Sequence, residues 1–96
     1  MKDEISELQA WYRTQCNGDW EHTYGVTIGT LDNPGWTVTI DLAETALADR
    51  GFTIVESLNH DADWMRCEVK DQKWLGNGGP TMLRPILRTF LTWANG

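Results

Sequence analysis

The fold is decided by residues 24–42, which read YGVTIGTLDNPGWTVTIDL. Larger apolar side chains alternate with small or polar ones on both sides of the centre, and this period of two indicates strands with one buried face. Between the two runs lie Asp32, Asn33, Pro34 and Gly35, each of which favours a turn. The sequence therefore predicts an antiparallel hairpin built from residues 24–29 and 36–42.

Further strand patterns follow this hairpin along the chain. Residues 52–58 and 64–70 have strand-like composition and are joined by a polar turn, and residues 73–75 predict a short fifth strand. Residues 43–51 are expected to form one helical turn or a loop. The glycine-rich run at 76–79 is expected to end the strand pattern.

A helix is predicted at each end of the chain. In residues 3–16, Ile5, Leu8 and Tyr12 recur at helical spacing behind an acidic start. The second helix is expected to begin at about Thr81, the expected cap, with Pro85 in its first turns. Its apolar side follows the helical period at Leu83, Ile86, Leu87, Phe90, Leu91 and Ala94.

These elements predict an α+β fold in one domain, residues 1–96. Consecutive strands with short turns favour an antiparallel sheet, here of about five strands. The N- and C-terminal helices each have an apolar stripe, and both are expected to pack on one face of that sheet.

The charge of the chain favours some partners over others. The net charge is −6, and acids outnumber bases over residues 1–70. Such a surface repels nucleic acid and anionic membranes and attracts a basic protein. The chain has no run of about 18 apolar residues and no apolar segment typical of a signal peptide near Met1. We therefore expect a cytoplasmic protein, with Cys16 and Cys67 as free thiols.

The sequence offers little for catalysis. Cys16 and His22 are close along the chain, but acids follow Cys16 and are expected to raise its pKa, which opposes activation of a nucleophile. Histidines, cysteines and acids do not show the paired spacings of a metal site. The glycine run before Pro80 lacks the lysine and serine of a phosphate loop. We therefore predict no catalytic residue, no metal and no cofactor.

Residues 19–25 have a composition that favours a binding function over catalysis. This run combines two aromatic rings, two acids and a histidine, and Trp and Tyr are frequent anchors of protein interfaces. The alternative is that Trp20 and Tyr24 belong to the core and that Glu21 and His22 form an internal polar pair. The residues predicted to contact a partner are Asp19, Trp20, Glu21, His22, Tyr24, Asp32, Asp61 and Asp63.

The same residues carry a family resemblance. The runs NGDWEH at 17–22 and LDNPGW at 31–36 are similar to the immunity protein 53 family of bacterial polymorphic-toxin systems. The resemblance continues through Trp11-Tyr12, Gln15-Cys16, Tyr24-Gly25, Ile40–Leu42, Asp63-Trp64, Cys67, Gly79-Pro80 and Phe90–Trp93, and so covers nearly the whole chain. It implies a protein that neutralises a cognate toxin, either by occupying the toxin's active site or by holding the toxin inactive.

This resemblance and the acidic charge lead to one main hypothesis. The partner is a toxin domain with a basic active-site surface, and the protein itself is a monomer or weak dimer without catalytic activity. Two alternatives stay open at this level: a small enzyme that uses Cys16 or His22, and a module that associates with itself through exposed tryptophans.

Overall fold

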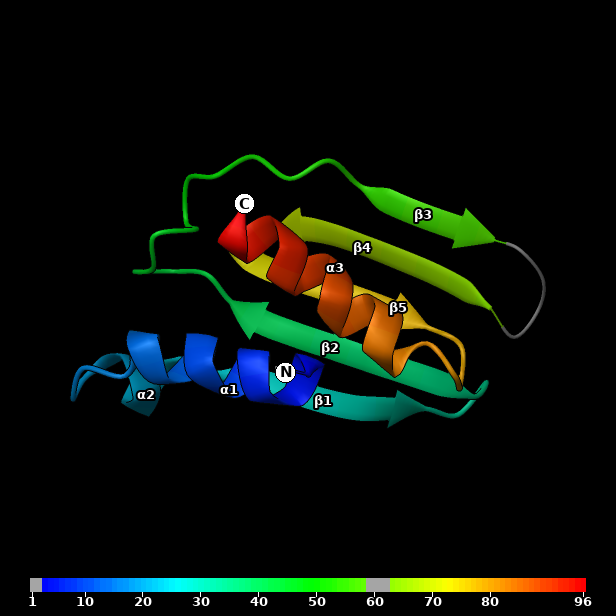
Figure 1. Cartoon of the computed structure of the whole chain (residues 1–96), viewed down its shortest axis with the longest axis horizontal. Coiled ribbons are helices and arrows are strands. Elements are labelled where there is room, and N and C mark those ends of the chain that lie inside the picture. The colour runs from blue at the N-terminus through cyan, green and yellow to red at the C-terminus, as the bar shows by residue number, and fades with distance from the viewer. Residues whose placement is uncertain (1–2, 59–62) are drawn as a thin grey trace.

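The protein is a five-stranded antiparallel sheet with a helix at each end of the chain (Figure 1). The structure, a computed structural model, describes residues 3–58 and 63–96. Its elements are α1 (Glu4–Gln15), α2 (Trp20–Thr23), β1 (Val26–Leu31), β2 (Gly35–Asp41), β3 (Val55–Leu58), β4 (Trp64–Lys70), β5 (Lys73–Gly78) and α3 (Leu83–Asn95). The predicted α+β fold is thus confirmed.

The strand order is β1-β2-β5-β4-β3, so β5 lies in the middle of the sheet. Hairpins join β1 to β2 and β4 to β5, while the connection after β2 carries the chain to the far edge, where β3 begins. The last strand then pairs with β2, with Ile40 opposite Trp74 and Val38 opposite Gly76. Strands β1 and β3 are consequently the two edges of the sheet.

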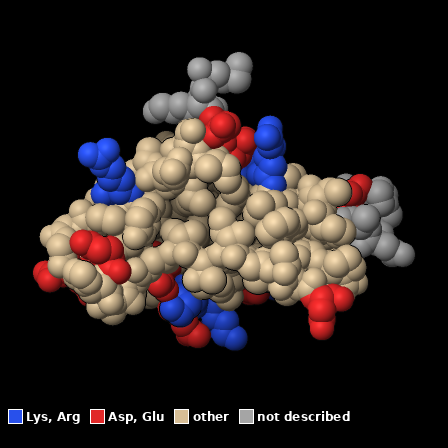
Figure 2. All heavy atoms as spheres, turned by 90° about the horizontal axis from the view of Figure 1, so that it is seen from below, with Lys and Arg blue, Asp and Glu red and all other residues tan. Residues whose placement is uncertain are grey.

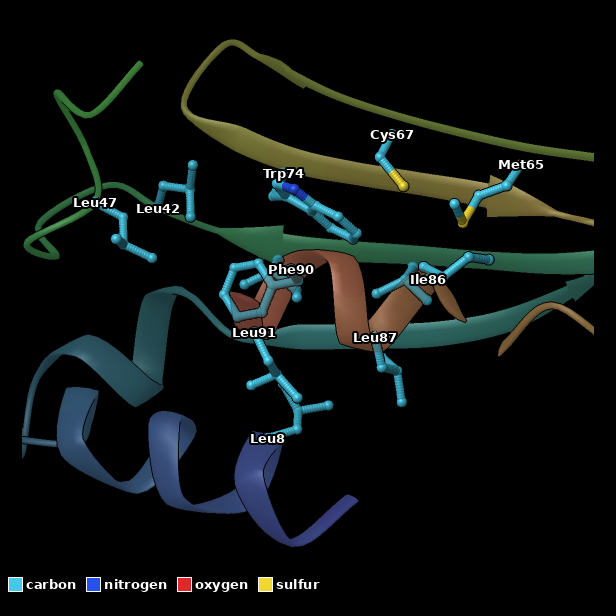
Figure 3. Close-up of a cluster of buried hydrophobic side chains, with 12 residues drawn as sticks. Leu8, Leu42, Leu47, Met65, Cys67, Trp74, Ile86, Leu87, Phe90 and Leu91 are labelled. Atoms are coloured by element: carbon cyan, nitrogen blue, oxygen red, sulfur yellow. The ribbon is translucent and has the colours of Figure 1, made fainter. Parts of the chain in front are cut away.

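One face of the sheet forms the core together with the helices (Figure 3). Alternate side chains of the central strands point to this face and are buried: Val38, Ile40, Met65, Cys67 and Trp74. Helix α3 covers them with Ile86, Leu87, Phe90 and Leu91, and α1 adds Leu8. Both long helices lie in front of the sheet in Figure 1, as the two apolar stripes predicted.

Two groups fix α1 in place. The Oδ1 of Asp3 accepts a hydrogen bond from the backbone N–H of Ser6 at 2.7 Å and so caps the helix. The guanidinium of Arg88 in α3 donates to Glu4 at 2.8 Å and to Glu7 at 2.5 Å. These hydrogen bonds raise the pKa of Arg88 and lower that of Glu4.

The glycine run at 76–79 does not end the strand pattern, which corrects the prediction. Strand β5 continues to Gly78 because α3 packs directly on it. A Cβ atom at Gly76 would lie 2.5 Å from Cγ2 of Ile86 and 2.7 Å from the ring of Trp74. Glycine is therefore required here by the close approach of a helix.

Two smaller predictions change, those for the cap of the last helix and for the start of the third strand, while the predictions for Pro85 and for residues 43–51 agree with the structure. Helix α3 begins at Leu83 and its cap is Met82, so Thr81 does not cap it. Pro85 is the third residue of α3, and its missing N–H would have had no partner within the helix. Residues 52–54 precede β3 without strand pairing, and residues 43–49 form turns. Phe52 nevertheless packs edge-on against Trp74 and Trp93.

Candidate partner-binding site

Residues 17–21 form a loop that closes on itself through hydrogen bonds. The Oδ1 of Asn17 accepts from the backbone N–H groups of Asp19 and Trp20, at 3.0 and 2.9 Å. The carboxylate of Glu21 accepts in return from the N–H groups of Asn17 and Gly18, both at 3.0 Å. Gly18 has φ +95°, a conformation that favours glycine. The run NGDWE therefore has a structural reason that is independent of any partner.

Trp20 is only 3% exposed and lies inside a cluster of aromatic rings. Its Nε1 donates to the carbonyl of Ala43 at 2.9 Å. The rings of Trp11, Tyr12 and Tyr24 surround it at centroid distances of 6.2, 6.1 and 6.0 Å. Of the two interpretations that the sequence left open, the structure supports the core role for Trp20. Contacts from this end of the molecule must come from its neighbours.

The residues next to Trp20 in the sequence differ in how far their side chains are exposed to a partner. Asp19 and His22 are exposed, whereas Glu21 and Tyr24 are half-buried. The hydroxyl of Tyr24 lies 3.4 Å from the carboxylate of Glu44. Backbone N–H donors, first its own and then those of Asn17 and Gly18, lower the pKa of Glu21. The Glu21 carboxylate is thus engaged in hydrogen bonds that hold the loop together. Asp19 and His22 are the more accessible side chains for contact with a partner.

Glu21→Gln is expected to make the protein less stable at neutral pH and less sensitive to acid. The folded pKa of Glu21 lies below its ordinary value of 4.5. Its contribution to stability is therefore present above that value and is lost as the pH falls through the folded pKa. Thermal melts should show a difference in melting temperature between wild type and variant that is smaller at pH 3 than at pH 7.

Asp49→Asn is the matched control for this experiment, because Asp49 is exposed and its carboxylate makes no hydrogen bond or ion pair to any described residue. Its melting temperature should stay close to that of the wild type at both pH values. A Glu21→Gln variant that behaves like this control at pH 7 would contradict the structural role of the carboxylate.

Asp32 and Asp63, two of the three remaining predicted residues, lie at the opposite end of the sheet. Asp32 is exposed in the turn between β1 and β2, and Asp63 accepts a hydrogen bond from the hydroxyl of Thr81 at 3.4 Å. Asp61 lies outside the described residues. The described residues of the predicted set are therefore divided between the two ends of the sheet and do not form one continuous patch.

The two cysteines occupy different environments. The thiol of Cys16 donates to the carbonyl of Tyr12 at 3.4 Å, and among the described residues it makes no hydrogen bond to His22. Cys67 is fully buried in β4, and burial raises its pKa to about 12. Within residues 3–58 and 63–96, no three of the histidines, cysteines and acids gather as metal ligands would. The helices of that part of the chain are also too short or too polar to span a bilayer.

Sequence reasoning missed a surface on the side of α1 and β1. Ile5 and Tyr12 on α1 are 53% and 38% exposed, and Ile28 on β1 is 39% exposed. A hollow of about 300 Å³ between the helix and the strand is lined by Leu8, Gln9, Tyr12, Gly25 and Val26. Figure 2 shows an uncharged band across the middle of the side that includes β1, with the charged groups towards its borders. The signal was the run VTIGTL at 26–31, which contains no charged residue.

Comparison with known proteins identifies a family for this chain. The model of the family described as immunity protein 53 matches residues 5–95 of the chain. No curated protein and no solved structure matches the chain significantly.

Proposed function

Because the chain belongs to the immunity protein 53 family, we propose that it binds a cognate bacterial toxin and neutralises it. The observation that carries this proposal is the family match over residues 5–95. The matched range includes all the described helices and strands except Glu4, the first residue of α1. The protein then acts in the cytoplasm as an inhibitor of a polymorphic toxin and has no turnover of its own.

The electrostatics favour a toxin with a basic active-site surface. The protein carries a net charge of −6, and exposed acids stand at both ends of β1, at Asp19 and Asp32. Opposite charges accelerate association and exclude an anionic substrate from the same cleft. We propose that the protein neutralises the toxin by covering its active site.

The division of charge also fits the usual anatomy of a protein interface. Such interfaces combine an apolar centre with a polar rim. Here the uncharged band across the side of β1 offers the centre, and the exposed acids Asp19 and Asp32 offer the rim. A protein of this size can supply the roughly 800 Å² per partner that a standard interface buries.

We expect a stable one-to-one complex with the toxin domain encoded beside this protein. Inhibition of a lethal enzyme requires a dissociation constant on the order of nanomolar or lower. Size-exclusion chromatography with light scattering measures the stoichiometry, and stopped-flow mixing at two salt concentrations measures the association rate. The rate should fall as salt rises, because salt screens the attraction.

A matched variant separates charge from fold in this experiment. Asp19→Asn with Asp32→Asn removes two exposed acids and should slow association while leaving the melting temperature close to that of the wild type. Separate elution of the two wild-type proteins at micromolar concentration would refute the proposed function.

A further inference from the structure

Strand β1 presents a backbone edge that no other strand of the described residues pairs with. The N–H of Asp41 donates to the carbonyl of Gly25 at 3.0 Å, so Gly25 and Asp41 are a hydrogen-bonded pair. In an antiparallel ladder such pairs alternate along the strand. The backbone groups of Thr27, Gly29 and Leu31 therefore point to β2, and those of Val26, Ile28 and Thr30 point to the open edge.

The two edges of the sheet are not equivalent. Proteins usually protect an edge strand by making it short or by placing charges or proline on it. Strand β3 follows this rule, because it has four residues and includes Glu56, which pairs with Arg66 at 2.8 Å. Strand β1 has six residues, VTIGTL, with neither a charge nor a proline. It is the edge that is left open to another strand.

The surroundings of β1 add a place for side chains. Ile28 and Val26 point to the same face of the sheet as the core residues, towards α1. The hollow between β1 and α1 is lined by Val26 and bordered by Tyr12. Alternate side chains of an added strand would enter the space between Ile28 and the exposed apolar residues of α1. The site therefore offers both backbone pairing and apolar burial.

We propose that β1 and the neighbouring side of α1 receive an extended segment of the toxin, which adds a sixth strand to the sheet. This inference rests on the proposed function. The segment has apolar side chains at alternate positions, facing α1, and a lysine or arginine towards each end. The basic ends follow from the acids near the two ends of β1. Asp19 precedes the strand, Glu44 approaches the same end through the hydroxyl of Tyr24, and Asp32 follows the strand.

A second copy of this chain fits the same edge poorly. Two copies of β1 can pair antiparallel through the outward backbone groups of Val26, Ile28 and Thr30. The register that pairs all three places Ile28 opposite Ile28 of the other copy, and it therefore places Asp32 opposite Tyr24. The Tyr24 hydroxyl lies 3.4 Å from the carboxylate of Glu44, so two acids would meet at each end. Each copy also carries a net charge of −6. The charges thus favour a basic partner over a twin.

The test compares variants in binding the toxin domain encoded beside this protein. Ile28→Lys places a charge on the edge, and Ile54→Lys is its control, because Ile54 is 51% exposed and precedes the opposite edge strand. Thr30→Pro removes one outward N–H, and Thr30→Ala is its control because it retains that group. We expect Ile28→Lys and Thr30→Pro to raise the dissociation constant at least about 30-fold, as loss of an interface hot spot does, and both controls to bind like the wild type.

Three other outcomes would overturn the inference. Melting curves first establish that each variant is folded. If the wild type binds and Ile28→Lys and Thr30→Pro bind equally well, the edge is not the contact and the proposed function stands. If the wild type forms no complex, both proposals fail. If the wild type alone is a dimer that Ile28→Lys separates into monomers, a second copy occupies the edge.

Discussion

Phe90→Ala is expected to lower the free energy of unfolding by about 3–5 kcal/mol, the usual cost of removing a fully buried phenyl ring. The Phe90 residue is 0% exposed, and its ring packs edge-on against the rings of Trp11 and Trp74, with centroid distances of 5.1 and 5.3 Å. It also contacts Trp93 at 6.2 Å. The substitution thus opens a cavity where α1, α3 and β5 meet, and equilibrium unfolding in urea measures the loss.

Thr92→Ala is the control for this prediction, since Thr92 is an exposed residue two positions further along α3. It should change the unfolding free energy by less than about 0.5 kcal/mol. A loss below about 1.5 kcal/mol in Phe90→Ala, with an unchanged urea dependence, would mean that the aromatic cluster is not packed as described.

Gly76→Ala is expected to lower the free energy of unfolding by about 1–3 kcal/mol or more, because the added methyl group overpacks the core. The new Cβ would lie 2.5 Å from Cγ2 of Ile86 and 2.7–2.8 Å from two ring atoms of Trp74. Contacts this short force a helix or a large ring to move, and both belong to the core. Thermal melts and urea unfolding should show the loss together.

Gly29→Ala provides a matched control within the same sheet. A Cβ at Gly29 would meet only Cγ2 of Thr37, at 3.6 Å, which is ordinary van der Waals contact. Alanine should therefore be neutral or slightly stabilising there, because glycine loses more backbone entropy on folding. Equal losses at both positions would show that strand propensity, and not the approach of α3, explains the glycine at position 76.

These two changes also bear on the proposed binding surface. Trp11 contacts both Phe90 and Trp20, so α1 is held by the same aromatic cluster that fills the core. The position of α1 sets the width of the hollow beside β1. A rigid α1 keeps that hollow in place before a partner arrives, and preorganisation of this kind raises affinity.

The sequence alone determined the features that depend on neighbouring residues. Apolar residues at helical spacing behind an acidic start predicted α1, and alternation around the run LDNPG predicted the β1–β2 hairpin. The apolar period near the C-terminus predicted α3, with Pro85 in its first turns. Local hydrogen bonds, side-chain periodicity and proline geometry suffice for each of these, because all of them act within a few positions along the chain.

Only the tertiary structure decided the rest, because it depends on residues that are distant along the chain. In the sequence Gly76 and Gly78 are typical of a strand end, whereas in the structure they allow α3 to pack closely on β5. Trp20 is typical of an interface anchor, whereas in the structure its N–H donates to the carbonyl of Ala43. Strand β1 is an edge because β5 pairs with the other side of β2. The insertion of the last strand into the middle of the sheet thus determines which backbone is left for a partner.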